Sequence, residues 1–425
     1  MARRKKETDE EDKTPPVKES SALQVKMGKE QSAFFAQMEK LAPGSVATAS
    51  SLTRDLPRIS TGNFGLDVAT YGGIPQGRIS RFWGKPKSAK SGASLSAAAS
   101  FQRNHCSECF QRECDCKGRS VPFVFYIDAE NKMLDQLSWV ESHGVILDAF
   151  KVMAPPSGQH IIDCVDMLLR SPQIAKCGLV IVDSLAHVSA QEELSKLASD
   201  GPTVGRNASL INLGFRKWAT AITSLGVANK RKTTIIAINQ LRSKVGVTYG
   251  SPDVMPGGMG QEYGTSLDMR FDAAGGAYLM WSEKKQKFEA KLKGFKSNFK
   301  PGPDMTPDFT SVNYRVSASA VCPSGRSGSF NYWLKPQHGH HPGDPDNALQ
   351  LWNYSKRYLL ETEGHLKKIQ GTAVEARTLD ELETLFRASP QAQKTVWPVL
   401  MQKLCKDDHV NATGGVEEDE ETLEV

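Results

Sequence analysis

The chain has 425 residues, 39% of them hydrophobic, and a formal net charge of +5. This length predicts one large domain with additions, or two to three domains, because a compact domain usually holds about 100–200 residues. No uninterrupted apolar run reaches the roughly 18 residues that a membrane-spanning helix needs, which excludes a transmembrane protein of that kind. The first residues are basic but no apolar run follows them, so we expect no secretory signal.

The charge is distributed unevenly. Residues 1–26 carry seven Lys or Arg and six Asp or Glu with almost no large apolar side chains, so we expect residues 1–28 to form a disordered charged arm. Residues 414–425 hold six acidic residues and no basic one, and we expect 411–425 to be a disordered acidic tail. Without that tail the net charge would be +11 instead of +5. A basic body with an acidic tail fits a polyanion-binding protein, and it fits equally well a tail that only adds solubility.

Helical and strand patterns alternate along the chain. Phe34, Phe35, Met38 and Leu41 have helical spacing, which predicts a helix over 31–42 that ends at Pro43-Gly44. The following elements are predicted in order: a strand at 79–83, a helix at 90–103, a strand at 122–127, a helix at 159–169, a strand at 179–182, a helix at 208–225 and a strand at 234–238. Strands separated by such helices form βαβ units, so the predicted fold class is α/β, with a mostly parallel central sheet and helices on both faces.

The character of the chain changes after residue 272. Strand-like runs at 314–321 and 330–334 precede helical patterns at 347–360 and 379–386. We therefore predict an N-terminal helix and strand at 29–56, a core at 57–335 and a smaller α+β C-terminal domain at 336–410.

A candidate phosphate-binding loop lies between the first predicted core strand and helix. The P-loop pattern G-x-x-x-x-G-K-[ST] is matched at seven of its eight constraints by Gly84, Lys85, Pro86, Lys87, Ser88, Ala89, Lys90 and Ser91. Lys90 would reach the β- and γ-phosphates and Ser91 would hold Mg²⁺, while backbone N–H groups cradle the phosphates. Ala89 stands where the second Gly belongs, and its methyl group restricts the backbone. An ordinary basic turn is the alternative.

Two carboxylates follow other predicted strands. Asp183 ends the strand at 179–182, where a P-loop enzyme positions Mg²⁺ and its water. Glu130 follows the strand at 122–127 and could polarise the water that attacks the γ-phosphate. Because parallel strands bind ligands at their carboxyl ends, we expect these groups and the loop to meet at one edge of the sheet.

The segment after the fourth predicted strand carries a family resemblance. Residues 239–247, NQLRSKVGV, resemble the N-Q-x-R-x-K-x-G-V segment of the RecA recombinases, and ISTG at 59–62 and YIDAE at 126–130 match the same family. The resemblance covers about residues 30–335. The residue Ala89 at the relaxed loop position is similar to the UvsX recombinases of T-even-like phages.

The resemblance implies a RecA-like P-loop ATPase core and an ATP-dependent DNA recombinase. Such a protein forms a helical filament on single-stranded DNA and exchanges strands with homologous duplex DNA, in recombination, repair and recombination-dependent replication. It implies ATP and Mg²⁺ as cofactors, and self-association through the helix at 31–42. It also implies a loader or mediator and a single-strand-binding protein as partners, no membrane, and a cytoplasmic location, that of the host if the protein is phage-encoded.

The resemblance also implies roles for single residues. Lys90, Glu130 and Gln240 would be catalytic, with Gln240 sensing the γ-phosphate, Asp183 would act on Mg²⁺, and Trp139 would stack on adenine. DNA binding would fall to residues on Gly-rich loops, where cations neutralise phosphates and Val247 or Tyr249 enters between bases: Arg206, Arg242, Lys244, Gly246, Val247, Tyr249, Gly257 and Gly258. A surface hairpin with ordinary charges is the alternative for this segment.

One departure from the family pattern leaves the activity open. The family places lysines late in the strand after the DNA loops, and residues 315–322 offer none after Arg315. Hydrolysis would then be slow, or the protein would be a DNA-coating filament that uses ATP only as an assembly switch. A hexameric helicase built on the same core is a further alternative.

Four of the eight cysteines lie within eleven residues, at Cys106, Cys109, Cys114 and Cys116. Four thiolates so close together can hold Zn²⁺ tetrahedrally, so we predict a structural zinc site in an insertion at 105–117. Four free thiols or redox chemistry are the alternatives. Without an export signal we expect a reducing compartment and no disulfide framework.

Two further polar clusters have plainer interpretations. His338, His340 and His341 lie in a Gly/Pro-rich stretch and predict a polar turn. Residues 283–300 hold seven Lys and two Glu, which predicts either a solvated hairpin or a second site for duplex DNA.

Overall fold

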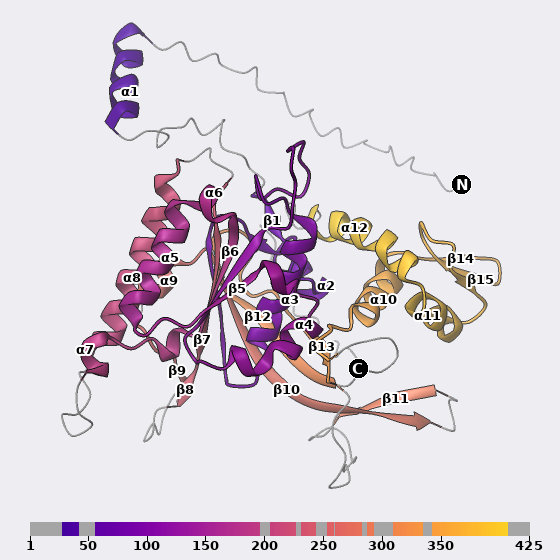
Figure 1. Cartoon of the computed structure of the whole chain (residues 1–425). Helices are drawn as coiled ribbons and strands as arrows, with labels where there is room; N and C mark the ends of the chain where they lie inside the picture. Colours follow the sequence, from indigo (N-terminus) through magenta and orange to yellow (C-terminus); the bar gives the residue numbers. More distant parts are fainter. Residues whose placement is uncertain are drawn as a thin grey trace, which may run out of the picture. The chain divides into compact units, whose positions relative to one another are not determined.

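The computed structural model describes nine stretches of the chain (Figure 1): residues 28–41, 56–195, 205–226, 231–243, 253–258, 260–282, 287–292, 309–334 and 342–406. The chain divides into two compact units, residues 1–46 and 47–425. The first unit contains α1 (Lys29–Leu41), which starts two residues before the predicted helix. Its apolar side chains are exposed within that unit, with Phe34 at 59% and Leu41 at 85%. The strand predicted after this helix, the charged arm and the acidic tail lie outside the described residues.

A mixed, mostly parallel sheet organises the second unit, and this confirms the predicted α/β class. Its spatial order is β13-β12-β10-β3-β7-β6-β4-β5, with β11 paired to β10 off this path. Neighbours from β10 through β5 are parallel, whereas β10 pairs antiparallel with β11 and β12, and β12 with β13. The strand bounds are β3 (Ile79–Gly84), β4 (Phe123–Asp128), β5 (Phe150–Met153), β6 (Cys177–Asp183), β7 (Thr234–Gln240), β10 (Leu267–Ser282), β11 (Lys287–Leu292), β12 (Phe309–Ser319) and β13 (Ser327–Trp333).

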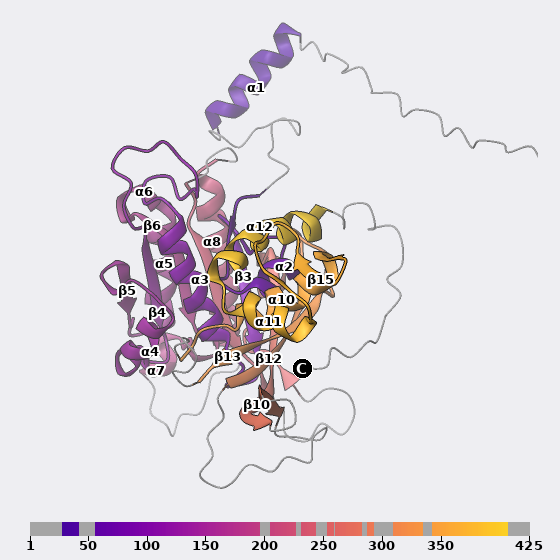
Figure 2. The ribbon, with the colours of Figure 1, turned by 90° about the vertical axis from the view of Figure 1, so that its right-hand side faces the viewer.

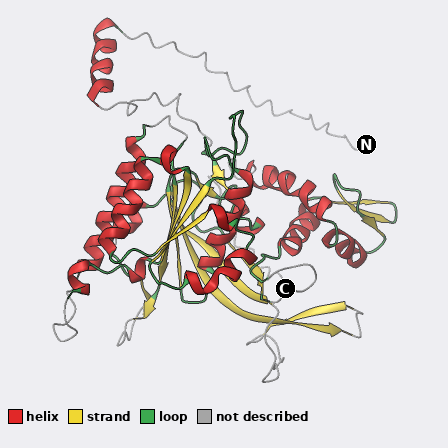
Figure 3. Ribbon diagram, in the orientation of Figure 1, coloured by secondary structure: helices red, strands yellow, loops and turns green. Residues whose placement is uncertain are grey.

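Helices cover both faces of this sheet (Figure 3). The longer ones are α3 (Lys90–Asn104), α5 (Gly158–Arg170) and α8 (Arg206–Ser224). Alternate residues of β6 point to opposite faces, so Ile181 joins the core beneath α3 and Val182 joins the core beneath α5 and α8. The run 179–182 within β6 is apolar at every position because it is buried on both sides, as the sequence predicted.

Shorter elements connect these layers. They are β1 (Arg58–Ile59), α2 (Phe64–Ala69), β2 (Ile74–Pro75), α4 (Leu137–Ser142), α6 (Pro172–Ala175), α7 (Gln191–Leu194), β8 (Arg242–Ser243), β9 (Asp253–Val254) and α9 (Gly260–Gly264), with 3₁₀ turns at Met133–Gln136, Leu147–Ala149 and Leu185–His187. No helix among the described residues has the length and apolar character needed to cross a bilayer.

The C-terminal segment packs around a core of its own (Figure 2). Its elements are α10 (Asn347–Tyr358), β14 (Leu360–Glu363), β15 (Leu366–Ile369), β16 (Glu375–Ala376), α11 (Leu379–Arg387) and α12 (Pro390–Lys406). Phe64 of α2 enters this core edge-on to Trp397, with ring centroids 5.1 Å apart. A phenyl ring from α2, near the start of the second unit, therefore ties the C-terminal segment to the rest of that unit.

The described part of the lysine-rich run is β11, which pairs antiparallel with β10. Backbone pairing of β10 with β11 runs from Ala277 opposite Leu292 to Ser282 opposite Lys287. The lysine side chains, and the histidines at 338, 340 and 341, lie outside the described part of the chain.

A buried ion pair joins two central strands. The guanidinium of Arg81 on β3 donates from Nε to Oδ1 of Asp268 at 2.8 Å and from Nη2 to Oδ2 at 2.7 Å. The two side chains are only 1% and 8% exposed. Removing one partner of such a pair leaves an uncompensated buried charge.

We expect Asp268→Ala to lower the free energy of unfolding by about 3–5 kcal/mol, measured by chemical denaturation. Asp272→Ala is the matched control, because its pair with Arg270 is more than a third exposed and contributes less than about 1 kcal/mol. Arg81→Met combined with Asp268→Leu should restore most of the loss. Equal losses for the two single variants would contradict this interpretation.

Candidate functional site

A cleft of about 430 Å³ opens where four adjacent parallel strands end. Its lining comes from the loop after β3 and from the carboxyl ends of β4, β6 and β7. Because these strands are parallel, the groups that follow them project at the same edge of the sheet. The cleft is lined by residues 86–91 of the predicted loop together with Glu130, Trp139, Asp183 and Gln240.

The loop between β3 and α3 contains residues with positive φ angles, a backbone conformation that glycine adopts easily and alanine does not. Gly84 has φ +152°, and a Cβ there would overlap the carbonyl oxygen of Phe271 on β10, so only glycine fits. Ala89 lies in the left-handed region at φ 60°, ψ 21°. The methyl group at this position therefore does not prevent the conformation that glycine would adopt, although it makes that conformation costlier.

Lys90 is held by the loop itself. Its ammonium donates to the carbonyl oxygens of Gly84 at 3.2 Å and Lys85 at 2.7 Å, and to Oγ of Ser88 at 3.1 Å. Burial lowers the pKa of Lys90 to about 8, against the opposing effect of the nearby carboxylates Asp183 and Glu130. An arriving phosphate can take over from these loop oxygens as the partner of the ammonium.

Ser91 and Asp183 form a pair of oxygen groups at the floor of the cleft. Ser91 Oγ donates to Asp183 Oδ2 at 2.5 Å, and the phenol of Tyr126 donates to the same oxygen at 2.5 Å. Burial raises the pKa of Asp183, and these two hydrogen bonds oppose that shift. Burial, and after it the charge of Asp183, holds the pKa of Tyr126 well above its ordinary value, so its phenol stays a donor.

Glu130 is the centre of a polar network. Its Oε1 accepts hydrogen bonds from Gln240 Nε2 and from Ser184 Oγ, the latter at 2.8 Å, and its Oε2 accepts from Lys132 Nζ at 2.7 Å. His187 Nδ1 lies 3.1 Å from Oε1. Burial alone would raise the pKa of Glu130, but the hydrogen bonds from Lys132 and Ser184 outweigh it and the pKa is lowered. The carboxylate is therefore charged at neutral pH.

Trp139 forms an aromatic wall of the cleft. It lies on α4 and meets His143 edge-on, with ring centroids 4.9 Å apart and an interplanar angle of 86°. His143 in turn lies against the backbone of Gly92 on α3. The tryptophan predicted to stack on a base is thus in the same cleft as the phosphate loop.

Comparisons with known proteins agree with this geometry. The family model of the RecA N-terminal domain matches residues 32–306, well over half of the chain. The chain belongs to the RecA family. Protein RecA of Legionella pneumophila (strain Corby) is 33% identical over 245 residues, which is 56% of this chain and 62% of the relative. Protein RecA of Colwellia psychrerythraea is 33% identical over 244 residues, or 56% and 63% of the two chains, and that of Desulfovibrio desulfuricans 36% over 221, or 51% and 54%.

The match spans less than two thirds of those RecA proteins. It establishes the family and its α/β core. The finer resemblance to phage UvsX recombinases stays a prediction.

The residues predicted for DNA binding are only partly described. Arg206 is exposed at the start of α8, and Arg242 on β8 donates from Nη2 to the carbonyl oxygen of Ala186 at 2.8 Å. Gly257 and Gly258 both have left-handed backbones, at φ +99° and +72°. Lys244, Gly246, Val247 and Tyr249 lie outside the described residues.

The base of the segment predicted to bind DNA, between β7 and Pro256, is fixed next to the cleft. Asn239 Nδ2 donates to the carbonyl oxygen of Pro256 and to Gln261 Oε1, both at 2.9 Å. Asn239 immediately precedes Gln240, which touches Glu130. The segment that leaves β7 and returns at Pro256 is therefore anchored one residue from the cleft.

Sequence reasoning missed four side chains of the site: Tyr126, Lys132, Ser184 and His187. Ser184 directly follows Asp183 and Lys132 lies two residues after Glu130, so proximity in sequence could have indicated both. Tyr126 precedes Asp128 by two and shares its side of the strand, but nothing in the pattern distinguishes it from a core aromatic.

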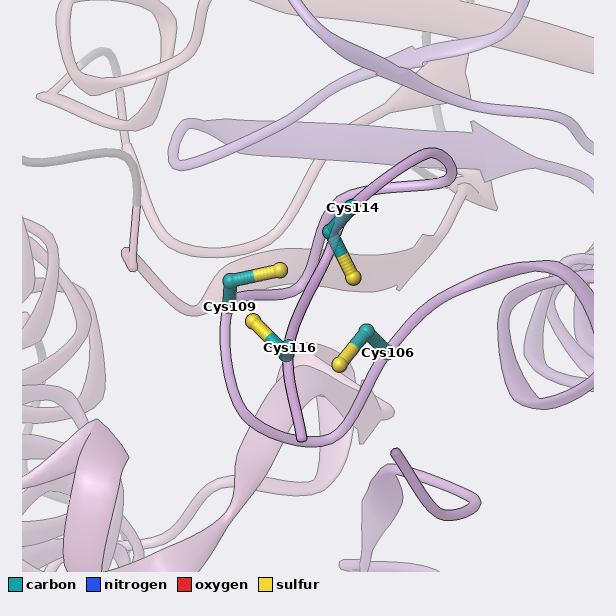
Figure 4. A group of neighbouring side chains, drawn as sticks. All are labelled: Cys106, Cys109, Cys114 and Cys116. Atoms are coloured by element: carbon teal, nitrogen blue, oxygen red, sulfur yellow. The ribbon is translucent and has the colours of Figure 1, made fainter. Parts of the chain in front are cut away.

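The four clustered cysteines converge in the insertion between α3 and β4 (Figure 4). Their sulfur atoms all lie within 4.8 Å of one another. The backbone N–H of Glu108 donates to Sγ of Cys106 at 3.3 Å, a hydrogen bond that suits a thiolate ligand. The insertion docks through Phe110, which is fully buried and packs on Phe101 of α3.

The left-handed backbone conformation of Ala89 leads to a testable prediction about the stability of the protein. We expect Ala89→Gly to raise the free energy of unfolding by roughly 1 kcal/mol, because glycine adopts this conformation without the Cβ penalty. Ala93→Gly, at a buried position inside α3, is the control and should lower it by about 1 kcal/mol. Thermal or denaturant unfolding measures both, and loss of stability in both variants would contradict the prediction.

Proposed function

We propose that the protein is an ATP-dependent DNA recombinase that assembles on single-stranded DNA and exchanges strands with homologous duplex DNA. The observation that carries the proposal is the hydrogen bond between Gln240 and Glu130. Gln240 ends β7, and the segment that follows it bears the predicted DNA-binding residues. Gln240 therefore contacts the carboxylate of Glu130 in the cleft and also lies at the start of that segment. Through this contact a change in the bound nucleotide can alter DNA binding.

The residues of the cleft fit a magnesium nucleotide. Ser91 and Asp183 offer the hard oxygen ligands that Mg²⁺ prefers, directly or through water, and the loop offers backbone N–H groups and Lys90 to phosphates. When bound, Mg²⁺ would neutralise negative charge on the β- and γ-phosphates. Trp139 would contact the base.

The chain's own groups account for the rest of the hydrolysis. Glu130, charged and fixed by Ser184 and Lys132, would accept a proton from the water whose oxygen attacks the γ-phosphorus, while the bond to the ADP oxygen breaks. Gln240 would move between Glu130 and the phosphate as the nucleotide changes. Lys90 would exchange the loop carbonyls for phosphate oxygens.

Assembly and partners are part of the same proposal. The exposed apolar face of α1, with Phe34, Phe35, Met38 and Leu41, would dock on a neighbouring copy in the filament. A loader and a single-strand-binding protein would assist assembly, and a phage UvsX-type source accords with Ala89.

A second candidate is a filament that uses ATP only as an assembly switch. It is favoured by Ala89 in the loop and by residues 309–334, which contain no lysine. The two candidates differ in DNA-stimulated turnover.

We expect Glu130→Gln to lower DNA-stimulated ATP hydrolysis by about 100-fold or more, because the variant loses its general base, while filaments still form. Phosphate release measures the rate. Glu141→Gln, at an exposed position on α4, is the matched control and should behave as wild type. Electron microscopy with single-stranded DNA and a slowly hydrolysed ATP analogue should show helical filaments for wild type and none for Lys90→Ala.

Absence of nucleotide-dependent filaments in wild type would reject the recombinase. Filaments without DNA-stimulated turnover would favour the switch.

We also propose that Cys106, Cys109, Cys114 and Cys116 hold one structural Zn²⁺. The support is the convergence of four sulfur atoms within 4.8 Å and the buried anchor Phe110 beside them. A metal there would fix a loop that is too short to have a core of its own.

Elemental analysis should find one zinc per chain, lost in Cys109→Ser and retained in Cys164→Ser, a cysteine of α5 outside the cluster. A chelator should lower the unfolding temperature of wild type and leave Cys109→Ser, already without zinc, unchanged. Metal-free protein with four freely titratable thiols would reject the site.

A further inference from the structure

We propose that Tyr126 is a positioning residue for the magnesium site, which fixes the carboxylate of Asp183 through its phenol. The inference rests on the proposed function, because it assigns a role towards the Mg²⁺ of the same cleft. Tyr126 belongs neither to the loop at 84–91 nor to the carboxylates that follow the strands, so this role is additional to theirs.

Tyr126 is held rigidly where it can act. It lies on β4, opposite Ile181 of the neighbouring β6, and its side chain is 2% exposed. Its ring packs against Phe150 of β5 with centroids 5.6 Å apart. The packed ring leaves the hydroxyl little freedom, and it points to the floor of the cleft, of which Tyr126 is a lining residue.

The hydrogen bonds at Asp183 show what the phenol contributes. Oδ2 accepts from Tyr126 and from Ser91, each at 2.5 Å. A carboxylate oxygen has two lone-pair sites, so these two donors use Oδ2 fully and direct further bonds to Oδ1. Bonds from donors to a charged oxygen are the stronger class of hydrogen bond.

The shared oxygen also orients Ser91. The serine hydroxyl donates its hydrogen to Asp183, so its lone pairs remain available to a cation. If the carboxylate turned, the hydroxyl would turn with it. The ammonium of Lys90 attracts the carboxylate of Asp183, and the phenol of Tyr126, anchored in the core, holds that carboxylate in its orientation.

The chain offers a matched control in Tyr332. It is buried to a similar degree, at 3% exposure, in the same core cluster, but its hydroxyl interacts with Ser96 instead of Asp183. Replacing either tyrosine by phenylalanine removes one oxygen atom and keeps the ring. Only in Tyr126→Phe does the lost oxygen belong to a hydrogen bond with Asp183.

The test is a Mg²⁺ titration of the binding of a fluorescent ATP analogue to the full chain, at a fixed nucleotide concentration. We expect Tyr126→Phe to raise the Mg²⁺ concentration at half-saturation about tenfold, the loss expected for one hydrogen bond to a charged group. Tyr332→Phe should match wild type. At saturating Mg²⁺ the nucleotide affinity of Tyr126→Phe should return to that of wild type.

Three results would overturn the inference: an unchanged Mg²⁺ requirement, an equal shift in both variants, or weaker nucleotide binding that excess Mg²⁺ does not restore. The last would mean that Tyr126 only supports the shape of the cleft. If wild type itself binds no nucleotide at any Mg²⁺ concentration, the proposed function fails, and this outcome is distinguishable from the other three.

Discussion

The register of four parallel strands is the constraint on which the rest of the site depends. Gly84, which begins the phosphate loop, lies opposite Gln240 at the end of β7, and Asp128 lies opposite Asp183 at the end of β6. The ends of these strands are therefore level, and whatever follows each one projects into the same cleft. A shift of one residue would turn these side chains to the other face of the sheet. The apolar, doubly buried β6 and β7 fix that register through their packing against both helical layers.

The same register places the cleft next to the segment that is proposed to bind DNA. Gln240 contacts Glu130 across β6, and the adjacent Asn239 holds the carbonyl of Pro256, which follows the segment after β7. Two neighbouring residues of one strand thus face the cleft and the loop base. Alternate side chains of a strand point in opposite directions, so a small movement of β7 would shift both the contact of Gln240 with Glu130 and the contact of Asn239 with Pro256. Such a coupling needs no long pathway through the protein.

Local patterns in the sequence predicted the scaffold well and the contacts of the site poorly. Continuous apolar runs and helical spacing were enough for the central strands, α3 and α8, since each signal is contained in its own segment. No local pattern predicted α12, which contains Pro398, or the 16-residue β10, which contains paired glycines. Packing in the folded chain outweighs local preference at both places. The hydrogen bond of Tyr126 to Asp183 joins residues 57 positions apart in the sequence. The hydrogen bonds of the Lys90 ammonium to the carbonyls of Lys85 and Gly84 span five and six positions. Neither contact follows the period of a helix or a strand, so the sequence pattern does not predict them.

The cysteine insertion and the cleft lie at opposite ends of the elements that join them. The insertion follows the last turn of α3 and precedes the start of β4, whereas the cleft uses the first turn of α3 and the end of β4. A metal at the four sulfurs would thus be separated from the cleft by the length of a 15-residue helix. Gly178 at the start of β6 has no room for a Cβ because Phe101 and Phe110 occupy that space. The insertion is therefore packed into the amino edge of the sheet, where it can stabilise the register of the strands without contacting the reacting groups at their other end.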